Sequence, residues 1–471
     1  MSHRVGRSRP SPTWIALLGS ILACMACMAC MSPSEPAPRE RVHEDAAPTC
    51  PSASIPETRA PDVEPEMEHA EFWLAKLGAG QADAVLIGPG EREAIAARIA
   101  ATPGSRRDPI DPALAEPAHV DAELGERLEW LRGRVASGKY VEGEVGALEQ
   151  AADVIARASA VDEADALHTI LRETPLWCVP TQAGLYTTPI DRDFDRNQCA
   201  SLHLGELVRV IRRAEGWAYL DTGHSVGWIA LTEPAPLGPA RNASDVAAAR
   251  SGEHWWVLDD WSVPELVGVT LRAGTRFARE ADTLRLPTAG GETSLTIGSE
   301  APLATAPLPF TRRAVFERTF AQLGDPYGWG GRAGHRDCSS LLLDVFAQFD
   351  LSLGRNSAVQ SQLGVHTIEL AGQSDQAKRA AIRAAAERGV VLLYMPGHIM
   401  LYLGHHTSGG VDHDYGLSAI SDYLVPCPGG SDTVHRLDRV AVTTLELGRG
   451  SERKAYLERI ERLAVFAPVA P

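Results

Sequence analysis

The chain has 471 residues, of which 44% are hydrophobic and 23% charged, and its formal net charge at pH 7 is −16. This length and composition suit roughly two to four ordinary globular domains. Because the chain is acidic and no run of Lys or Arg stands out beyond its N-terminus, the sequence argues against nucleic acid as a partner.

The N-terminus is typical of an export signal. Arg4, Arg7 and Arg9 precede an apolar stretch at 14–23. That stretch is too short for a transmembrane helix, which needs about 20 apolar residues. A basic segment followed by a short apolar one predicts a secretory signal rather than a membrane span.

The sequence ILAC at 21–24 resembles a bacterial lipobox, in which the cysteine is lipidated and becomes the mature N-terminus. We therefore expect residues 1–24 to be a lipoprotein signal peptide and Cys24 to carry the lipid. Cys27 and Cys30 are alternatives because the ACMAC repeat blurs the register, and an ordinary signal peptide cleaved nearby is another. A lipidated chain would be anchored to a membrane of the cell envelope. Met25 is not Asp, which predicts the periplasmic face of the outer membrane in a Gram-negative cell.

Two segments follow before the first β-rich region. Residues 25–65 are rich in Pro, Ser, Ala and Glu and predict a disordered tether. Residues 66–165 show apolar positions at helical spacing, at 94–101 and at 123–137. We expect 66–165 to be a helical packing module without a catalytic role, since no polar cluster in it suggests chemistry.

Short β-rich runs between turns occupy 170–235 and 250–308, and they predict two small barrels. Cys178 and Cys199 lie in the first of them and are the candidates for a disulfide, which an exported chain can form. No Cys or His pairing has zinc spacing, so we predict no metal site and no cofactor.

The section at 310–445 combines helices with strands. A helix is expected at 311–324, another at 376–389, and a third that starts at Cys338, because Leu342, Val345, Phe346 and Phe349 recur at helical spacing. Strands are expected around the Pro-Gly turn in VVLLYMPGHIMLYLG and again at 411–420. A helix followed by an antiparallel sheet predicts an α+β fold. Residues 446–471 are expected to form a C-terminal helix and tail.

Cys338 lies where a cysteine can react. Asp337 is a good N-cap, so the thiol falls in the first helical turn, where free backbone N–H groups lower a thiol pKa and can hold an oxyanion. A thiol nucleophile needs a base. Among the 15 histidines, only His398 lies at a defined strand start after a Pro-Gly turn. The alternatives are a buried structural cysteine and a histidine that merely caps a strand edge.

The motifs DPYGWGG, DCSS, GRNSAVQSQ and GHIMLYLG occur in this order in the C-terminal region. With them, the region 310–445 resembles the NlpC family of papain-like cysteine peptidases. The stretch 191–229, with its FDRNQ, GE and GW-I marks, resembles the bacterial SH3-type (SH3b) barrels that accompany this domain. The helical region from 66 resembles the N-terminal module of the same bacterial lipoproteins.

This resemblance implies that the protein hydrolyses peptidoglycan stem peptides, between D-γ-glutamyl and a diamino acid. By the match, Cys338 is the nucleophile and His398 the base. Family members with paired SH3b domains act on peptides with a free N-terminal L-Ala. The match gives ligand contacts to Asp337, Ser339 and Tyr327 and, more weakly, to Glu206 of the first barrel. The family's tyrosine before the GW motif is missing from 224-HSVGW-228, which puts this narrow preference in doubt.

The family orients its catalytic histidine with a third polar group, usually His, on the next strand. If the hairpin turn centres near Ser408, position 418 faces His398, and there the sequence has Ser418. The rival, His413, lies five residues along the strand from that position, roughly 16 Å away. A serine can accept the hydrogen bond but reaches less far and carries no charge.

Three functions therefore stay open. The first is a membrane-anchored cell-wall endopeptidase whose partners are stem peptides. The second is a wall-binding lipoprotein whose catalytic domain is weak or inactive, which Ser418 favours and the Cys338–His398 pair opposes. The third is a related cysteine transferase or amidase with the same dyad. The sequence does not indicate an oligomeric state.

Overall fold

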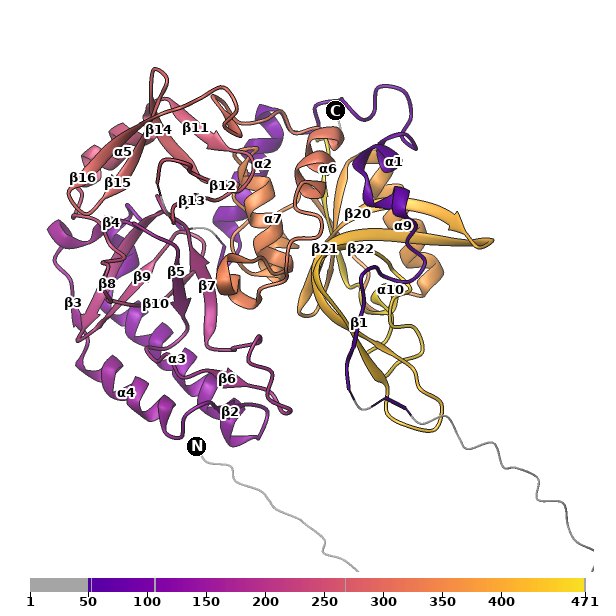
Figure 1. Ribbon diagram of the computed structural model, residues 1–471, viewed down its shortest axis with the longest axis horizontal. Helices are drawn as coiled ribbons and strands as arrows, with labels where there is room; N and C mark the ends of the chain where they lie inside the picture. Colours follow the sequence, from indigo (N-terminus) through magenta and orange to yellow (C-terminus); the bar gives the residue numbers. More distant parts are fainter. Residues whose placement is uncertain (1–49, 52, 106, 267, 470–471) are drawn as a thin grey trace, which may run out of the picture. The chain divides into compact units, whose positions relative to one another are not determined.

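The computed structural model describes residues 50–469 except 52, 106 and 267, and the described residues belong to one compact unit (Figure 1). The predicted signal peptide, lipidation at Cys24 and residues 25–49 of the predicted tether lie outside the described residues. Helices and sheets are mixed along the chain, which confirms the α+β class. No helix in the described part of the chain has both the length and the apolar composition that crossing a membrane requires.

The first β-rich region is an open sheet in the order β3-β8-β9-β10-β5-β7, with β4 also paired to β8. Its strands are β3 (Ser159–Ala160), β4 (Leu167–Thr169), β5 (Thr174–Trp177), β7 (Gln198–Leu202), β8 (Leu207–Ala214), β9 (Trp217–Asp221) and β10 (Val226–Ala230). A separate pair joins β2 (Val141–Glu142) to β6 (Leu185–Tyr186). We call this region, with α3 (Pro117–Ala136) and α4 (Ala147–Arg157), the first β module.

The second β-rich region, here the second β module, contains a sheet in the order β16-β15-β14-β11-β17 and a two-stranded pair β12-β13. Its elements are α5 (Ala243–Ser251), β11 (His254–Val257), β12 (Trp261–Ser262), β13 (Thr270–Leu271), β14 (Arg276–Glu280), β15 (Thr283–Thr288), β16 (Gly291–Thr296) and β17 (Leu303–Ala304).

The prediction of closed barrels is wrong for the described residues, because the strand pairings of neither module close on themselves. In the first β module the reason is that both faces of the sheet are covered. Val208 and Leu220 belong to the apolar cluster of one face, whereas Tyr219 and Trp228 pack with Val120 of α3 in another. A sheet buried on both faces does not need closure to hide its apolar residues. The SH3b resemblance stays a prediction.

The predicted helical module at 66–165 has no core of its own. Helices α1 (Ala70–Leu74) and α2 (Pro89–Ala101) place Trp73 and Ile95 in the core of the C-terminal domain. By contrast, α3 and α4 pack against the first β module, as Figure 1 shows for the sheet of β8 to β10. Helical periodicity identified α2 and α3, but it does not say which neighbour covers an apolar stripe.

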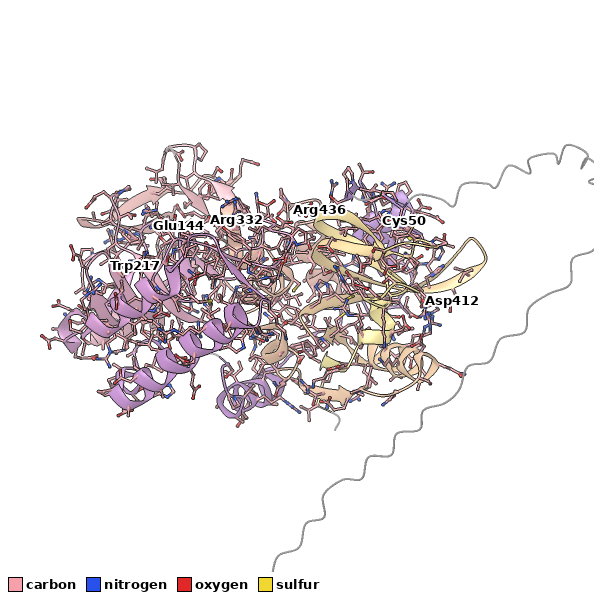
Figure 2. The ribbon with its side chains drawn as sticks, turned by 90° about the horizontal axis from the view of Figure 1, so that it is seen from below. Cys50, Glu144, Trp217, Arg332, Asp412 and Arg436 are labelled. Atoms are coloured by element: carbon pink, nitrogen blue, oxygen red, sulfur yellow. A yellow bond between two sulfur atoms is a disulfide. The ribbon has the colours of Figure 1, made fainter. Side chains whose placement is uncertain are left out.

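The end of the predicted tether is ordered, so the prediction of disorder is wrong for residues 53–65. Strand β1 (Ile55–Pro56) pairs in parallel with β22, and the short 3₁₀ helix η1 (Pro65–Glu68) follows it. Cys50 forms a disulfide with Cys427 in the β21–β22 turn (Figure 2). Proline-rich composition suggested disorder, but pairing and a distant disulfide hold this segment on the sheet.

The C-terminal domain is built on a sheet in the order β1-β22-β21-β20-β19-β23-β18. Its later strands are β18 (His366–Glu369), β19 (Val390–Met395), β20 (His398–Ser408), β21 (Val411–Val425), β22 (Thr433–Thr444) and β23 (Arg462–Phe466). Its helices are α6 (Arg312–Phe320), the 3₁₀ segment η4 (Trp329–Gly334), α7 (Cys338–Ala347), α8 (Ser357–Gln360), α9 (Asp375–Arg388) and α10 (Tyr456–Arg459).

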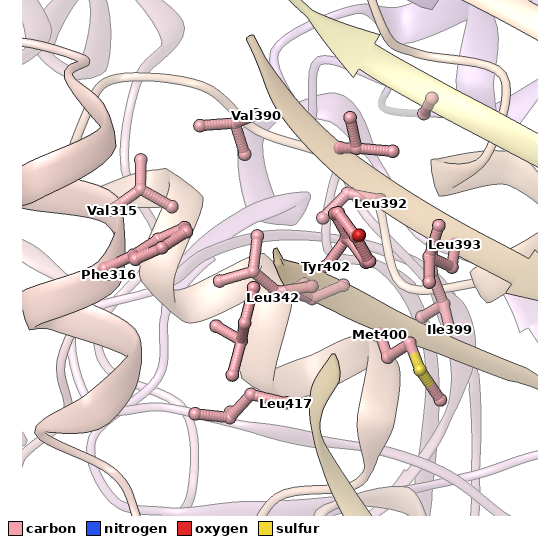
Figure 3. Close-up of a cluster of buried hydrophobic side chains, with 14 of the residues drawn as sticks. Val315, Phe316, Leu342, Val390, Leu392, Leu393, Ile399, Met400, Tyr402 and Leu417 are labelled. Atoms are coloured by element: carbon pink, nitrogen blue, oxygen red, sulfur yellow. The ribbon is translucent and has the colours of Figure 1, made fainter. Parts of the chain in front are cut away.

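The apolar side of α7 packs on this sheet and thereby fixes the position of Cys338. Leu342 of α7 lies among Phe316 of α6, Tyr402 of β20 and Leu417 of β21 in one buried cluster (Figure 3). The predicted C-terminal helix and tail at 446–471 is wrong in part, since β23 is an inner strand between β19 and β18. Its residues at 463–466 are fully buried, which a surface tail would not allow.

Candidate functional site

Cys338 is the first residue of α7, and Asp337 is its N-cap. The Asp337 carboxylate accepts hydrogen bonds from the backbone N–H of Ser339 at 3.2 Å and of Ser340 at 3.0 Å. The Ser340 hydroxyl in turn accepts from the N–H of Asp337 at 2.8 Å, which completes a capping box. The sequence therefore folds here as predicted, with the thiol at a capped helix start.

Among the described cysteines, Cys338 is the free one. Cys178 and Cys199 form a disulfide, as the sequence suggested, and Cys50 pairs with Cys427. The Cys338 side chain is buried, with the residue 8% exposed.

The predicted low pKa of this thiol is wrong for the structure described. Burial, together with the Asp337 carboxylate, raises the pKa of Cys338 to about 12, although the backbone N–H groups of Ile399 and Ser339 oppose the rise. A helix N-terminus favours a thiolate, but removal of water disfavours any charged form, and here the second effect is larger. The resting thiol is neutral.

His398 begins β20 directly after the Pro396–Gly397 turn, where Gly397 adopts a φ of +83°. Burial, with the nearby charge of Arg459, lowers the pKa of His398 to about 4. The imidazole is therefore neutral at pH 7. The ring of Tyr456 from α10 stacks on it, with the ring centroids 5.5 Å apart.

The start of α7 and the start of β20 lie together. The backbone N–H of Ile399 donates to the Cys338 sulfur. Since Ile399 directly follows His398, the structure brings the predicted nucleophile and the predicted base together at the start of the inner strand β20.

Ser418 lies beside the histidine: Nε2 of His398 is 3.0 Å from Oγ of Ser418. The predicted register was nonetheless wrong, because the hairpin turns at Gly409 and Gly410, with Ser408 paired to Val411. Beyond the bulge between Tyr402 and Gly404, Leu401 pairs with Leu417, so the position opposite His398 lies two residues past Ser418. The contact survives because diagonal neighbours on adjacent strands remain within reach.

The rival third residue, His413, is not at the site. It pairs with His406 near the hairpin turn. It is buried, and its Nδ1 has no hydrogen-bond partner in the described structure.

Asp337 and Ser339, the predicted ligand contacts, are both engaged by Arg355. The Arg355 guanidinium donates to both Asp337 carboxylate oxygens, at 3.0 and 2.5 Å, and to Oγ of Ser339 at 2.7 Å. Burial acts to raise the pKa of Asp337, but the charge and hydrogen bonds of Arg355 outweigh it and hold that pKa below its usual range. The carboxylate is thus ionised and already paired.

Burial and the charges of Asp337 and Cys338 raise the pKa of Tyr327. Its role as a ligand contact stays a prediction. Its ring packs against Phe194 of the first β module, with centroids 5.6 Å apart. On the same loop, Asp191 forms an ion pair with Arg436 of β22 at 2.7 Å (Figure 2). The loop between β6 and β7 therefore contacts the C-terminal domain beside the site.

Glu206 is not brought to the thiol. It accepts a hydrogen bond from the N–H of His203 at 3.1 Å, and burial raises its pKa to about 7. Among the described residues, neither a hydrogen bond nor an ion pair joins it to Asp337. His224, in the segment where the family's tyrosine is missing, is linked to the site, because its carbonyl accepts a hydrogen bond from the N–H of Arg355.

Three parts of the site were missed by the sequence reasoning: Arg355, Tyr456 and the N–H of Ile399. Arg355 stands inside the GRNSAVQSQ motif, so attention to the charge in that motif could have found it. Tyr456 gave no signal, because it lies in the stretch expected to be a tail.

Comparison with known proteins agrees with this geometry. Residues 324–422 match the NlpC/P60 family and include Cys338, His398 and Ser418. This part of the chain is therefore an NlpC/P60 domain, which points to a peptidase. No curated protein sequence matches the chain.

A solved structure shares the fold at low sequence identity. An NlpC/P60 endopeptidase from Photobacterium damselae subsp. piscicida superposes with a TM-score of 0.69 at 13% identity, over 89% of this chain and 100% of that one. An NlpC/P60 family protein from Bacillus cereus ATCC 10987 has a TM-score of 0.41 at 14% identity, over 64% of this chain and 100% of that one.

Proposed function

We propose that the protein is a cysteine peptidase that hydrolyses the amide between D-γ-glutamyl and a diamino acid in peptidoglycan stem peptides. The observation that carries the proposal is the meeting of a thiol in the first turn of α7, Cys338, with His398 and Ser418 inside the family match. A buried thiol and a half-buried imidazole, brought together at the start of β20, have the geometry of nucleophile and base.

In the proposed mechanism the resting pair is neutral. When Nε2–H of His398 is donated to Ser418, Nδ1 keeps its lone pair and can take the thiol proton. The resulting thiolate attacks the glutamyl carbonyl. Because Asp337 already accepts from the N–H groups of Ser339 and Ser340, the N–H of Cys338 remains to donate to the oxyanion.

The tetrahedral intermediate then collapses and expels the amine, which takes its proton from His398. A thioester remains on Cys338. Water, deprotonated by His398, attacks the thioester, releases the glutamyl carboxylate and restores the thiol.

Export and anchoring are part of the proposal. The lipobox-like ILAC motif suggests that Cys24 is lipidated, and the two disulfides suit an oxidising compartment. Palmitate labelling of the expressed chain should be lost in Cys24→Ser. Labelling that persists would move the lipid to Cys27 or Cys30.

The test is to incubate L-Ala-γ-D-Glu-diaminopimelate with the protein in ¹⁸O-water. Hydrolysis predicts L-Ala-γ-D-Glu with ¹⁸O in its γ-carboxyl group. Transfer of the glutamyl group to an added amine would instead identify a transferase.

The second candidate function is a wall-binding protein with weak catalysis, which the serine at the third position, Ser418, favours. Peptide binding without any cleavage would select this candidate.

A further inference from the structure

One guanidinium beside His398 has no carboxylate partner among the described residues. Arg459 is the last residue of α10 and is half-buried. Its side-chain hydrogen bond, from Nη2 to the carbonyl of Pro396, is long at 3.5 Å. Most of the N–H donors of this guanidinium are therefore left for a ligand. Arg459 lies beyond residues 324–422, so the family match assigns it no role.

The charged residues next to Arg459 are engaged elsewhere. Arg453 forms an ion pair with Asp422 at 2.5 Å. Glu458 accepts a hydrogen bond from the N–H of Ala455 at 2.7 Å. Burial lowers the pKa of Arg459, since it removes water from a cation that no neighbouring carboxylate compensates. A ligand anion at this guanidinium would offset that cost.

Arg459 is linked to His398 through the ring of Tyr456. That ring stacks on the imidazole with the centroids 5.5 Å apart, and the guanidinium carbon of Arg459 lies 6.0 Å from the centroid of the same ring. Pro396, which the guanidinium also approaches, precedes His398 by two residues. Both Pro396 and Gly397 are exposed, so a ligand can reach this side of the histidine from solvent.

The mechanism proposed above brings the leaving group to this side of the site. His398 gives its proton to the expelled amine, so the nitrogen of the diamino acid has to come within hydrogen-bond distance of the imidazole. The carbon bonded to that nitrogen carries the α-carboxyl group of the diamino acid. In diaminopimelate a second carboxyl group lies at the end of the side chain. Carboxylates of the leaving residue are therefore expected close to Arg459.

We propose that Arg459 binds a carboxylate of the leaving diamino acid and thereby selects substrates that carry one. The inference rests on the proposed function. A guanidinium can engage a carboxylate through two parallel hydrogen bonds, which are stronger where water is partly excluded. The carboxylate is either the α-carboxylate of a diamino acid that ends the peptide or the side-chain carboxylate of diaminopimelate, which lysine lacks.

A carboxylate bound to Arg459 also assists the reaction. The charge of Arg459 is one cause of the low pKa of His398, and a bound carboxylate offsets this charge. The imidazolium forms only when the thiol proton moves, so the carboxylate stabilises the transition state more than it stabilises the bound substrate. A substrate without the carboxylate should therefore lose kcat as well as affinity.

The test measures the binding of short peptides to the full chain with Cys338→Ala, which leaves them uncleaved. L-Ala-γ-D-Glu-diaminopimelate is compared with the same peptide in which both diaminopimelate carboxyl groups are amidated. The amidated peptide should bind about tenfold or more weakly. L-Ala-γ-D-Glu-L-Lys then identifies the carboxylate. Binding like that of the diaminopimelate peptide assigns the α-carboxylate, and binding like that of the amidated peptide assigns the side-chain carboxylate.

A second substitution in the same chain assigns the effect to the guanidinium. Arg459→Gln should weaken binding of the diaminopimelate peptide about tenfold or more and leave binding of the amidated peptide unchanged. Arg459→Lys keeps the charge and should restore part of the affinity. Arg462→Gln is the matched control, since Arg462 also lies over a tyrosine ring, 5.9 Å from the centroid of Tyr394, but is paired with Glu369. It should bind both peptides as the parent does.

With Cys338 restored, amidation of the diaminopimelate should lower kcat in the parent and not in Arg459→Gln. Equal binding of the two peptides by the Cys338→Ala chain, or an equal loss for both peptides in Arg459→Gln, would overturn the proposal. Cleavage by the parent together with equal binding would refute the carboxylate site alone. Binding that depends on the carboxylate and on Arg459, without any cleavage by the parent, would refute the peptidase alone.

Discussion

Burial acts on both members of the Cys338–His398 pair at the scale of single residues. It raises the pKa of the thiol to about 12 and lowers that of the imidazole to about 4. Across the neutral range both groups are therefore uncharged, and the proton has to move when substrate binds. This differs from a cysteine that rests as a thiolate beside a protonated histidine.

The first prediction concerns pH. Because His398 can accept a proton only while it is unprotonated, kcat/KM for a stem peptide should be level from about pH 6 upward and fall as pH drops through about 4. In the unfolded chain the same histidine takes up a proton near its ordinary pKa of 6.5. Because the unfolded chain binds this proton more readily than the folded one, the free energy of unfolding should fall as pH drops from 6.5 to 4. An acid limb centred above pH 6 would contradict the neutral pair.

The second prediction concerns the third residue. Ser418→Ala removes the oxygen 3.0 Å from Nε2 of His398 and should lower kcat by roughly ten- to a thousandfold, with KM little changed. The control is Ser421→Ala on the same strand, whose hydroxyl donates to Asp422 instead. If both variants retain the parent kcat, Ser418 does not orient the imidazole.

The positions of Cys338 and His398 at the starts of a helix and a strand were predictable because each carries a local signal, an N-cap in one case and a Pro-Gly turn in the other. The partners of these residues were not. The engagement of Asp337 by Arg355 joins positions 18 apart, and the stacking of Tyr456 on His398 joins a helix to a strand it does not follow in the chain. The pKa of the thiol depends on burial by such neighbours, which no local pattern encodes.

At the scale of elements, the start of α7 is held by a buried ion-pair network. Arg336 donates to Asp344 of α7 at 2.7 Å, to Asp260 of the second β module at 2.6 Å and to Gln322 at 2.7 Å. The arginine is 4% exposed. This network holds Arg336, the residue before the N-cap Asp337, and links it to the second β module.

The third prediction follows. Arg336→Met removes the guanidinium from the buried Asp344, which keeps only His203 at 3.6 Å as an ionic partner, whereas Asp260 keeps Arg272 at 2.7 Å. The variant should lower the free energy of unfolding by about 3 kcal/mol. Urea denaturation measures this change. The exposed pair at Arg132 provides the control, since Arg132→Met should change stability by less than about 1 kcal/mol. Equal effects of the two variants would show that the network does not stabilise the fold.

The fourth prediction concerns β1. In Cys427→Ser the segment that begins at Cys50 loses its disulfide, and the two-residue pairing of β1 with β22 is too short to hold it. Hydrogen exchange at the N–H of Glu57, which donates to the carbonyl of Arg436 at 2.7 Å, should become much faster than in the parent. Exchange at the N–H of Leu393 in the sheet centre should not change.

Periodicity predicted α6, α7, α9 and the β20–β21 hairpin, because each buries one face against the same core. The hairpin register was two residues off, since Gly409 and Gly410 form the turn and a bulge lies between Tyr402 and Gly404. Strand β23 was missed because its long-range pairing with β19 and β18 is set by the sheet and not by nearby residues.

At the scale of the whole molecule, the described residues form two β modules and a C-terminal NlpC/P60 domain that share helices from the N-terminal part of the chain. Short β-rich runs between turns predicted the β modules, but such runs do not distinguish a closed barrel from an open sheet covered by helices. The sequence of the helical region likewise predicted helices, but it did not indicate that some pack on the C-terminal domain and others on the first β module.

The central claim is that Cys338 attacks the γ-D-glutamyl amide of a stem peptide. The most direct test measures release of L-Ala-γ-D-Glu from L-Ala-γ-D-Glu-diaminopimelate by the full chain and by Cys338→Ala. We predict release by the parent and none by the variant, with both proteins folded as judged by the same urea midpoint. Release by Cys338→Ala at the parent rate, or no release by the folded parent, would contradict the claim.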